Sequence, residues 1–306
     1  MKCVVYVRGG NGDIYPFLAR LPKIMKKYKL EMKDIDIYLD SVYTLYPQQH
    51  KFNFDTMMRM FIVSGINKIY NIPLEVSSAD DLIWPSQNAV IYGPKINRNF
   101  KDDDFMFWRR WQTKEYIKDR LVDCLFIDNV VDQTYIWQNG KYTQVVSEEE
   151  PLEFTPSLDE TTRINILLQQ PHILIHYRVK GKEESEEHFS KIIEFCNKLN
   201  IMPILIGLKS ENLKGKFVDL REKLTVDGLF YITEQAKLML TSSSVLTFHR
   251  LYSNFSEKKT IVCSPYSLGG YENNFNQYVY KNKKHIFFNS DNDNFDKICE
   301  MIKNEI

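Results

Sequence analysis

The feature that most constrains the fold lies near the start of the chain, where an apolar run breaks into glycines. Residues 4–7 (Val-Val-Tyr-Val) are typical of a β-strand, and three glycines follow at positions 9, 10 and 12. Beyond them, Leu18 and Leu21 begin an apolar pattern with helical spacing. The segment therefore predicts a strand, a tight loop and a helix, which together open a Rossmann-like unit.

The loop Gly10-Asn11-Gly12 is a candidate ligand site. Glycines let the backbone adopt positive φ and let a ligand approach the main chain, while the following helix offers free N–H groups. The glycines at 9, 10 and 12 do not form the G-x-G-x-x-G pattern, and no acidic residue clearly ends the second predicted strand. A dinucleotide-dependent dehydrogenase is therefore disfavoured.

Asp13 has two interpretations. It could be the N-cap of the helix that runs to about Lys27, which is a common role for aspartate. Pro16 would then occupy the third helical position, where one of the two amides that a capping carboxylate normally binds is missing. A carboxylate beside glycines that is only partly used as a cap could instead face a ligand and act as a general base.

The composition is typical of a soluble globular protein, and its positive and negative charges balance, so the chain has no overall electrostatic field. The 306 residues hold 40 Lys plus Arg and 40 Asp plus Glu, so general attraction to nucleic acid or an anionic membrane is not indicated. No apolar run is long enough for a membrane span, and the first segment is too short for a signal peptide, so we expect a cytoplasmic protein. The five cysteines lack CxxC spacing, which argues against a zinc site or a disulfide framework.

The first half continues with alternating predicted strands and helices. Residues 100–121 are aromatic and charged and predict an amphipathic helix, although such a basic helix could also contact nucleic acid or an acidic lipid surface. Asn139-Gly140 between apolar runs signals a hairpin turn. The other predicted elements are strands at 35–39, 89–92, 125–128 and 135–137, and a helix from 54 to about 69.

A change of composition separates two halves. Residues 147–170 contain acidic clusters and prolines and are predicted as a linker, in which 158–168 could form a short helix. The second half then predicts strands at 172–177, 202–207, 229–232, 260–263 and 285–288, and helices at 184–199 and 294–306. We therefore expect two α/β domains with parallel sheets, residues 1–150 and 171–306, and a site in the cleft between them.

With both halves in view, the chain resembles the GT-B glycosyltransferases, and most closely the heptosyltransferase-like enzymes of glycosyltransferase family 9. Gly12-Asp13 and Leu18-Ala19-Arg20-Leu21-Pro22 are similar to that family's Gly-Asp followed by Leu-Pro. An ILIHY strand at 173–177, an ILIG strand at 204–207 and a serine-rich segment before His249 add to the likeness. The resemblance implies two Rossmann-like domains whose parallel sheets face each other across a cleft.

The same resemblance implies a hexosyl- or heptosyl-transferase that uses a nucleotide diphosphate sugar, with Asp13 as the base on the acceptor side. The acceptor would be a glycan, a lipid-linked compound or another hydroxyl, and a peripheral membrane contact stays open. Where the family has Asp-Ser/Thr-Gly-x-x-His, alignment on His249 puts Ser244 at the Asp and Leu246 at the Gly. An alternative is therefore a catalytically decayed relative that serves as a binding or scaffold protein.

Candidate donor-binding residues lie in the second half. Ser242, Ser243 and Ser244 precede a helix, where amides and hydroxyls suit a diphosphate, although an ordinary serine N-cap explains them too. His176, at the end of a predicted strand, is a further candidate donor contact. Arg178 and Lys180 follow it, and cations there could neutralise a leaving diphosphate or simply form a solvated loop. His249 could contact the nucleotide or be a buried histidine. Gly269 and Gly270 again allow close approach.

We expect no metal and no bound cofactor. Asp102-Asp103-Asp104 contains the Asp-x-Asp pattern by which metal-dependent transferases hold a divalent ion. Three acids before a predicted helix are also favourable N-terminal charges, and this is the preferred interpretation.

Overall fold

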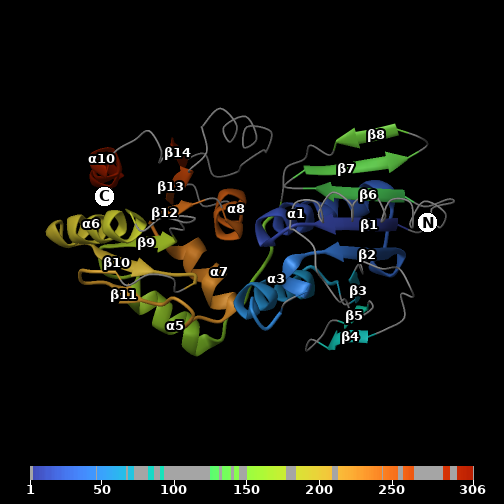
Figure 1. Cartoon of the computed structure of the whole chain (residues 1–306), viewed down its shortest axis with the longest axis horizontal. Coiled ribbons are helices and arrows are strands. Elements are labelled where there is room, and N and C mark those ends of the chain that lie inside the picture. Colours follow the sequence, from blue (N-terminus) through green and yellow to red (C-terminus); the bar gives the residue numbers. More distant parts are fainter. Residues whose placement is uncertain are drawn as a thin grey trace. The chain divides into compact units, whose positions relative to one another are not determined.

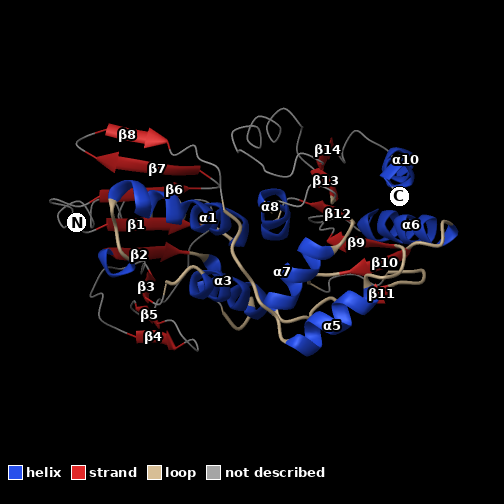
Figure 2. Cartoon of the chain, turned by 180° about the vertical axis from the view of Figure 1, so that it is seen from behind, coloured by secondary structure: helices blue, strands red, loops and turns tan. Residues whose placement is uncertain are grey.

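The chain divides into two compact units, Met1–Ser147 and Glu148–Ile306. The computed structural model describes residues 3–45, 47–66, 68–71, 82–85, 90–92, 125–130, 133–138, 141–144, 150–176, 184–208, 213–242, 244–253, 258–264, 285–289 and 295–305 (Figure 1). The described strands of each unit form one sheet, and helices lie beside it (Figure 2).

The described strands of the first unit form one mixed sheet in the order β4-β5-β3-β2-β1-β6-β7-β8. The five strands from β5 to β6 are parallel, whereas β4, β7 and β8 pair antiparallel at the two edges. The bounds are β1 Cys3–Arg8, β2 Ile35–Asp40, β3 Lys68–Asn71, β4 Leu82–Pro85, β5 Val90–Tyr92, β6 Leu125–Val130, β7 Gln133–Gln138 and β8 Lys141–Gln144.

Helices α1 (Asn11–Tyr28), α2 (Val42–Leu45) and α3 (Lys51–Val63) and the short 3-10 helix η1 (Met32–Asp34) belong to the first unit. The predicted helix from 54 to about 69 was wrong at its end, because α3 stops at Val63 and β3 begins at Lys68. Gly65 has a φ of 78°, the Gly65 N–H donates to the Ile62 carbonyl, and the Ile66 N–H donates to the Phe61 carbonyl. These two bonds form the usual glycine stop of a helix, which the apolar pattern alone does not reveal.

The described strands of the second unit form a parallel sheet in the order β11-β10-β9-β12-β13-β14. Their bounds are β9 His172–His176, β10 Met202–Leu205, β11 Val218–Asp219, β12 Leu238–Ser242, β13 Lys259–Ser264 and β14 His285–Asn289. The described helices are α5 Leu158–Leu167, α6 Glu184–Lys198, α7 Val226–Gln235, α8 Val245–Tyr252 and α10 Phe295–Glu305. The prediction of an α/β fold with two parallel sheets is thus confirmed.

One predicted strand of the second unit was wrong. Residues 229–232 lie inside α7, and the strand that enters the sheet is β12, immediately after it. The side chain of Thr225 caps α7 by accepting the Gly228 N–H at 3.0 Å. Leu229, Phe230 and Ile232 are all buried, so the helix presents an almost continuous apolar run that has no clear periodicity.

A cluster of apolar side chains joins α6 and α10 to the second sheet. Ile192 and Ile193 of α6 pack with Ile298 and Ile302 of α10, and all four are almost fully buried. Cys196 lies in the same cluster, and burial raises the pKa of its thiol to about 12. Cys3 and Cys196 are both buried free thiols and serve as small apolar core residues.

Several predicted features lie outside the described residues. They are the aromatic helix at 100–121, the hairpin turn at 139–140 and the loop after β9. The strands on either side of that turn, β7 and β8, pair antiparallel. Among the described helices, none is both long and apolar enough to cross a membrane.

Candidate functional site

The strand order reverses at the first strand of each sheet. In the first unit the chain leaves β1 toward β2 and later returns to β6 on the opposite side of β1. In the second unit it leaves β9 toward β10 and returns to β12 on the opposite side of β9. Ligands of open α/β sheets bind where the strand order reverses in this way. Residues 9–13 follow β1, and His176 ends β9, so both candidate regions lie at these positions.

Asp13 is not the N-cap of α1, which corrects one of the two interpretations of this residue. The helix begins at Asn11 with Gly10 as its N-cap, so Asp13 is the third helical residue. Its Oδ2 accepts the Gly10 N–H at 2.8 Å. Gly9 has a φ of 117°, and a Cβ added there would lie 2.2 Å from Oδ2 of Asp13. The half-buried carboxylate is thus folded back over the glycine loop, and only glycine fits beneath it.

Pro16 consequently lies deeper in the helix than the sequence suggested. It is the sixth helical residue rather than the third, and it cannot donate to the Gly12 carbonyl as an ordinary residue would. The argument that Pro16 deprives Asp13 of a capping amide is therefore wrong. Asp13 instead closes the loop through the N-cap amide of Gly10.

The other predicted loop residues hold the loop in place. Asn11 is buried, and its Nδ2 donates to the Asn53 carbonyl of α3 at 3.0 Å. Gly12 lies within the first turn of α1. Tyr43 of α2 was not singled out from the sequence, yet a Cβ added at Gly10 would lie 3.1 Å from its hydroxyl oxygen. Its position just after the carboxyl end of a parallel strand was the only available signal.

Two of the predicted donor-binding residues meet at the carboxyl edge of the second sheet. Ser244 is the N-cap of α8, and its Oγ lies 3.2 Å from Nδ1 of His176. Thr241 of β12 and Thr247 of α8 complete this group, with their hydroxyl oxygens 3.0 Å apart. We refer to His176, Thr241, Ser244 and Thr247 as the hydroxyl–histidine cluster. The two threonines were not among the predicted site residues, although Thr241 belongs to the polar run that drew attention to Ser244.

Gly207 provides the space for the ring of His176. It follows β10 with a φ of 96°, and a Cβ added there would lie 2.6 Å from Cδ2 and 2.9 Å from Nε2 of His176. No L-residue with a side chain fits this position without moving the ring. The cluster and Gly207 therefore lie at the carboxyl ends of three neighbouring strands, β10, β9 and β12.

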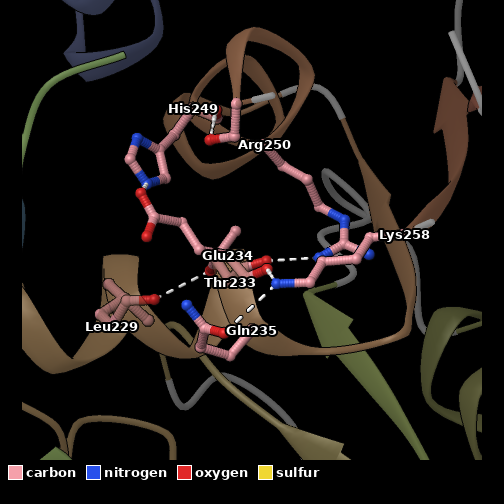
Figure 3. Close-up of polar contacts among 8 residues, drawn as sticks. Leu229, Thr233, Glu234, Gln235, His249, Arg250 and Lys258 are labelled. Carbon is pink, nitrogen blue, oxygen red and sulfur yellow. Dashed lines mark hydrogen bonds and ion pairs between the residues drawn. The ribbon is translucent and has the colours of Figure 1, made fainter. Parts of the chain in front are cut away.

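His249 contacts a different set of residues from the hydroxyl–histidine cluster. Its side chain is fully buried, and its Nε2 lies 2.7 Å from Oε1 of Glu234 (Figure 3). The ring stands edge-on to Phe230, with centroids 4.8 Å apart, and edge-on to Phe154 at 5.5 Å. Phe154 and Phe230 are themselves stacked, with ring centroids 3.9 Å apart. The histidine thus joins α8 to α7 and to the segment before α5.

The neighbouring Arg250 and Lys258 contact the carboxyl end of α7 (Figure 3). Arg250 is almost fully buried and donates to the carbonyls of Thr233, Lys237 and Lys259. Burial lowers its pKa to about 9. Lys258 donates to the Glu234 carbonyl at 2.6 Å, and desolvation, followed by the charge of Arg250, lowers its pKa to about 8. The carbonyls of Thr233 and Glu234 lie in the last turn of α7, where a helix leaves its carbonyls unpaired.

Of the remaining predicted site residues, the structure describes Ser242 alone. Ser242 is the last residue of β12 and pairs with Cys263 of β13. Arg178, Lys180, Ser243, Gly269 and Gly270 lie outside the described residues, as does Asp102-Asp103-Asp104. Within the described residues, no group of His, Cys, Asp and Glu could hold a metal ion.

No protein-family model and no curated protein matches the sequence. Among solved structures, ADP-heptose LPS heptosyltransferase II of E. coli matches with a TM-score of 0.50 and 10% identity, over 100% of this chain and 98% of that chain. The chain has the GT-B fold. At this identity the match shows the GT-B fold alone.

Two further matches have lower scores. A family 9 glycosyltransferase of Veillonella parvula matches with a TM-score of 0.45 and 10% identity, over 100% of this chain and 90% of that chain. The iron-containing dodecameric glycosyltransferase TibC of enterotoxigenic E. coli matches with a TM-score of 0.39 and 11% identity, over 94% of this chain and 66% of that chain. The match with heptosyltransferase II confirms the predicted resemblance at the level of the fold.

Proposed function

We propose that the protein is a glycosyltransferase that moves a sugar from a nucleotide diphosphate sugar to an acceptor hydroxyl. The observation that carries this proposal is that the strand order reverses at the carboxyl edge of each sheet, with a carboxylate at the first reversal and a hydroxyl–histidine cluster at the second. One edge would bind the acceptor and the other the donor. The matched heptosyltransferase II is named for ADP-heptose, which makes ADP the first nucleotide to try.

Asp13 is the proposed general base on the acceptor side. The Gly10 N–H and the positive end of α1 favour a negative carboxylate, which is the form that can accept a proton. The proton would move from the acceptor hydroxyl to Asp13 as the oxygen attacks the anomeric carbon. Gly10 and Gly12 carry no side chains that would obstruct the acceptor at this loop.

The donor side is proposed to be the second unit. Ser244 and His176 lie at the carboxyl edge of its sheet, and the amides that begin α8 suit the diphosphate. Ser242, Ser243, Arg178, Lys180, Gly269 and Gly270 complete the proposed donor set. The cations would neutralise the leaving diphosphate, and the reaction is proposed to proceed without a metal. We leave His249 out of the donor contacts because its side chain is fully buried.

One observation favours a second candidate function. Ser244 stands where the resembled family has aspartate, and its hydroxyl is engaged by the Thr247 amide and by His176. A relative that has lost the acidic donor contact would be a binding or scaffold protein. The transferase requires nucleotide-sugar turnover, whereas the scaffold requires none, so the two are separated by kinetics.

The test is Asp13→Asn, measured as release of nucleoside diphosphate from the nucleotide sugar that gives the largest thermal shift in a panel. Asparagine keeps an oxygen for the Gly10 N–H but cannot accept the proton, so kcat should fall about 10²- to 10⁴-fold with donor affinity unchanged.

The matched control is Asp34→Asn. Asp34 makes the same kind of contact, because its Oδ2 accepts the Glu31 N–H at 2.9 Å, but it lies in η1 away from the glycine loop. This variant should retain full turnover. If Asp13→Asn lowers the melting temperature while turnover stays intact, Asp13 only closes the loop.

A further inference from the structure

Tyr43 and Asp13 lie beside the same residue of the glycine loop. α2 begins just after β2, the strand next to β1 in the sheet, so Tyr43 lies at the same carboxyl edge as the loop. A Cβ added at Gly10 would lie 3.1 Å from the Tyr43 hydroxyl oxygen and 3.7 Å from its Cε2 and Cζ. The Gly10 N–H donates to Asp13 Oδ2 at 2.8 Å. The phenol and the carboxylate therefore flank one glycine.

Two neighbouring segments hold Tyr43 in position. Ser41 is buried, its Oγ accepts the Tyr43 N–H at 3.3 Å, and its carbonyl accepts the Thr44 hydroxyl at 2.7 Å. These bonds fix the first turn of α2. The ring of His50, the N-cap of α3, lies edge-on to the Tyr43 ring with centroids 5.7 Å apart. Because the side chain is held before a ligand arrives, little conformational entropy is lost when it binds one.

Tyr43 offers a ligand both an apolar surface and a polar tip. The residue is half-buried, so part of it stays open to solvent. Its ring can pack against the C–H face of a sugar ring, while its oxygen can bond a hydroxyl of that sugar. Tyr43 makes a further interaction within the protein, but a phenol oxygen that already donates or accepts one hydrogen bond has capacity for another.

The neighbouring charge restricts which chemical group fits beside Tyr43. A phosphate or carboxylate bound there would lie next to the Asp13 carboxylate, and like charges repel. A simple alcohol would use Asp13 and leave Tyr43 without a ligand contact. A ring that carries a second hydroxyl beside the reacting one contacts both residues.

We infer that Tyr43 binds the acceptor and that the acceptor group is a sugar ring. Asp13 takes the proton of one acceptor hydroxyl, and the Tyr43 hydroxyl bonds a neighbouring hydroxyl of the same ring. The inference rests on the proposed function, because it uses Asp13 as the base. Tyr43 takes no part in making or breaking bonds, so it sets acceptor affinity and specificity.

Binding is tested by saturation-transfer NMR with the methyl glycosides of glucose, galactose, mannose and N-acetylglucosamine, with and without ADP. Cyclohexanol is the comparison ligand, because its ring carries one hydroxyl. At least one glycoside should bind more tightly than cyclohexanol. In Tyr43→Phe its affinity should fall about two- to tenfold, as for one neutral hydrogen bond, and Tyr43→Ala should bind more weakly still. Binding of no glycoside, or wild-type affinity in both variants, overturns the inference.

Kinetics separate acceptor binding from chemistry. With the most tightly bound glycoside as acceptor, Tyr43→Phe should raise the acceptor KM about two- to tenfold and leave kcat and the donor KM unchanged. The control is Tyr231→Phe, because Tyr231 is a half-buried tyrosine of α7 whose hydroxyl donates to Asn165 Oδ1 at 3.0 Å. It should leave all three constants unchanged. A lower kcat at unchanged acceptor KM in Tyr43→Phe would contradict the acceptor contact.

The inference and the proposed function fail in different ways. If wild type releases nucleoside diphosphate from a nucleotide sugar but binds no glycoside, the inference fails while the proposed function stands. If wild type binds a glycoside through Tyr43 but neither binds nor turns over a nucleotide sugar, the proposed function fails. The sugar contact of Tyr43 then stands, and its assignment to an acceptor is overturned.

Discussion

Gly9 and Gly207 have the same role in the two units. Each has a positive φ, and each leaves space for a polar side chain at the carboxyl edge of its sheet, where the strand order reverses. A Cβ at Gly9 would lie 2.2 Å from Asp13 Oδ2, and one at Gly207 would lie 2.6 Å from His176 Cδ2. In both places a glycine just outside the sheet leaves the space in which the Asp13 carboxylate or the His176 ring lies.

Gly207→Ala should displace His176. The positive φ alone costs about 1–3 kcal/mol of stability for a residue with a side chain, and the Cβ would overlap the imidazole. Gly215→Ala is a matched control, because Gly215 has a φ of 106° and its Cβ would lie 2.6 Å from Ile193 Cγ2 in α6. Both variants should lose stability in chemical denaturation, but only Gly207→Ala should lose nucleoside diphosphate binding. Equal binding by the two variants would contradict the assigned role of Gly207.

The sequence could indicate Asp13, His176 and Ser244 as site residues, because a reactive group after a parallel strand is a readable signal. It could not place Asp13 at the third position of α1. Gly10, Asn11 and Asp13 are all good N-cap residues, so the sequence does not show which of the three precedes the helix. The contacts of Ser244 with Thr241 and Thr247 also depend on how α8 leaves β12, which a linear pattern does not contain.

α7 illustrates why one element was misassigned. Leu229-Phe230-Tyr231-Ile232 reads as a strand because a short apolar run does not reveal its period. The start of α7 is marked by Thr225, whose N–H donates to Glu160 Oε1 at 2.9 Å and whose side chain caps the helix. Its end is marked by Arg250 and Lys258, which reach it from later in the chain. Tertiary contacts therefore define both ends of this helix.

Lys258 should make stability depend on pH. Its pKa falls from 10.5 to about 8 in the fold, so between those values the unfolded chain binds more protons and stability should rise as pH rises. Below about pH 8 the lysine is charged in both states and this rise is absent. Melting temperatures from pH 7 to 10 should climb less in Lys258→Met than in wild type. The exposed Lys26→Met serves as control, and an unchanged slope in Lys258→Met would contradict the account.

Across the whole chain, the segment before α5 belongs to the second unit by its contacts. Leu152 and Phe154 are buried, and the Thr155 N–H donates to Asp227 Oδ2 at 3.3 Å. Glu160 of α5 binds Thr225 at the start of α7. The sequence suggested a linker at 147–170 because acids and prolines dominate it, and the few apolar residues that anchor it carry no periodic signal.

Two fragments should therefore behave differently. Residues 148–306 keep the Phe154–Phe230 stack and the Glu160–Thr225 bonds, and we expect a cooperative thermal transition by circular dichroism. Residues 171–306 lose both and leave the apolar face of α7 uncovered, so we expect aggregation or no cooperative transition. Equal melting temperatures for the two fragments would show that residues 148–170, including α5, are not needed for the second unit to fold, and would contradict this account.

The two parallel sheets were predictable because strands alternating with helices leave few other arrangements. The antiparallel pairing of β7 with β8 agrees with the hairpin signal at Asn139-Gly140. The antiparallel pairing of β4 with β5 and of β6 with β7 was less predictable, since pairing direction depends on connections whose geometry the sequence does not state. The GT-B fold is shown by the match with heptosyltransferase II, but the fold by itself does not identify a donor or an acceptor.

The most direct test of the proposed function is isothermal titration of the wild-type protein with ADP, GDP, CDP, UDP and dTDP in buffer that contains EDTA. We expect one of them to bind with a stoichiometry of one and without added metal, because the proposed donor set consists of amides, hydroxyls, His176 and cations. Heat of binding from none of the five, or binding only after a divalent ion is supplied, would contradict a metal-independent transferase built on this fold.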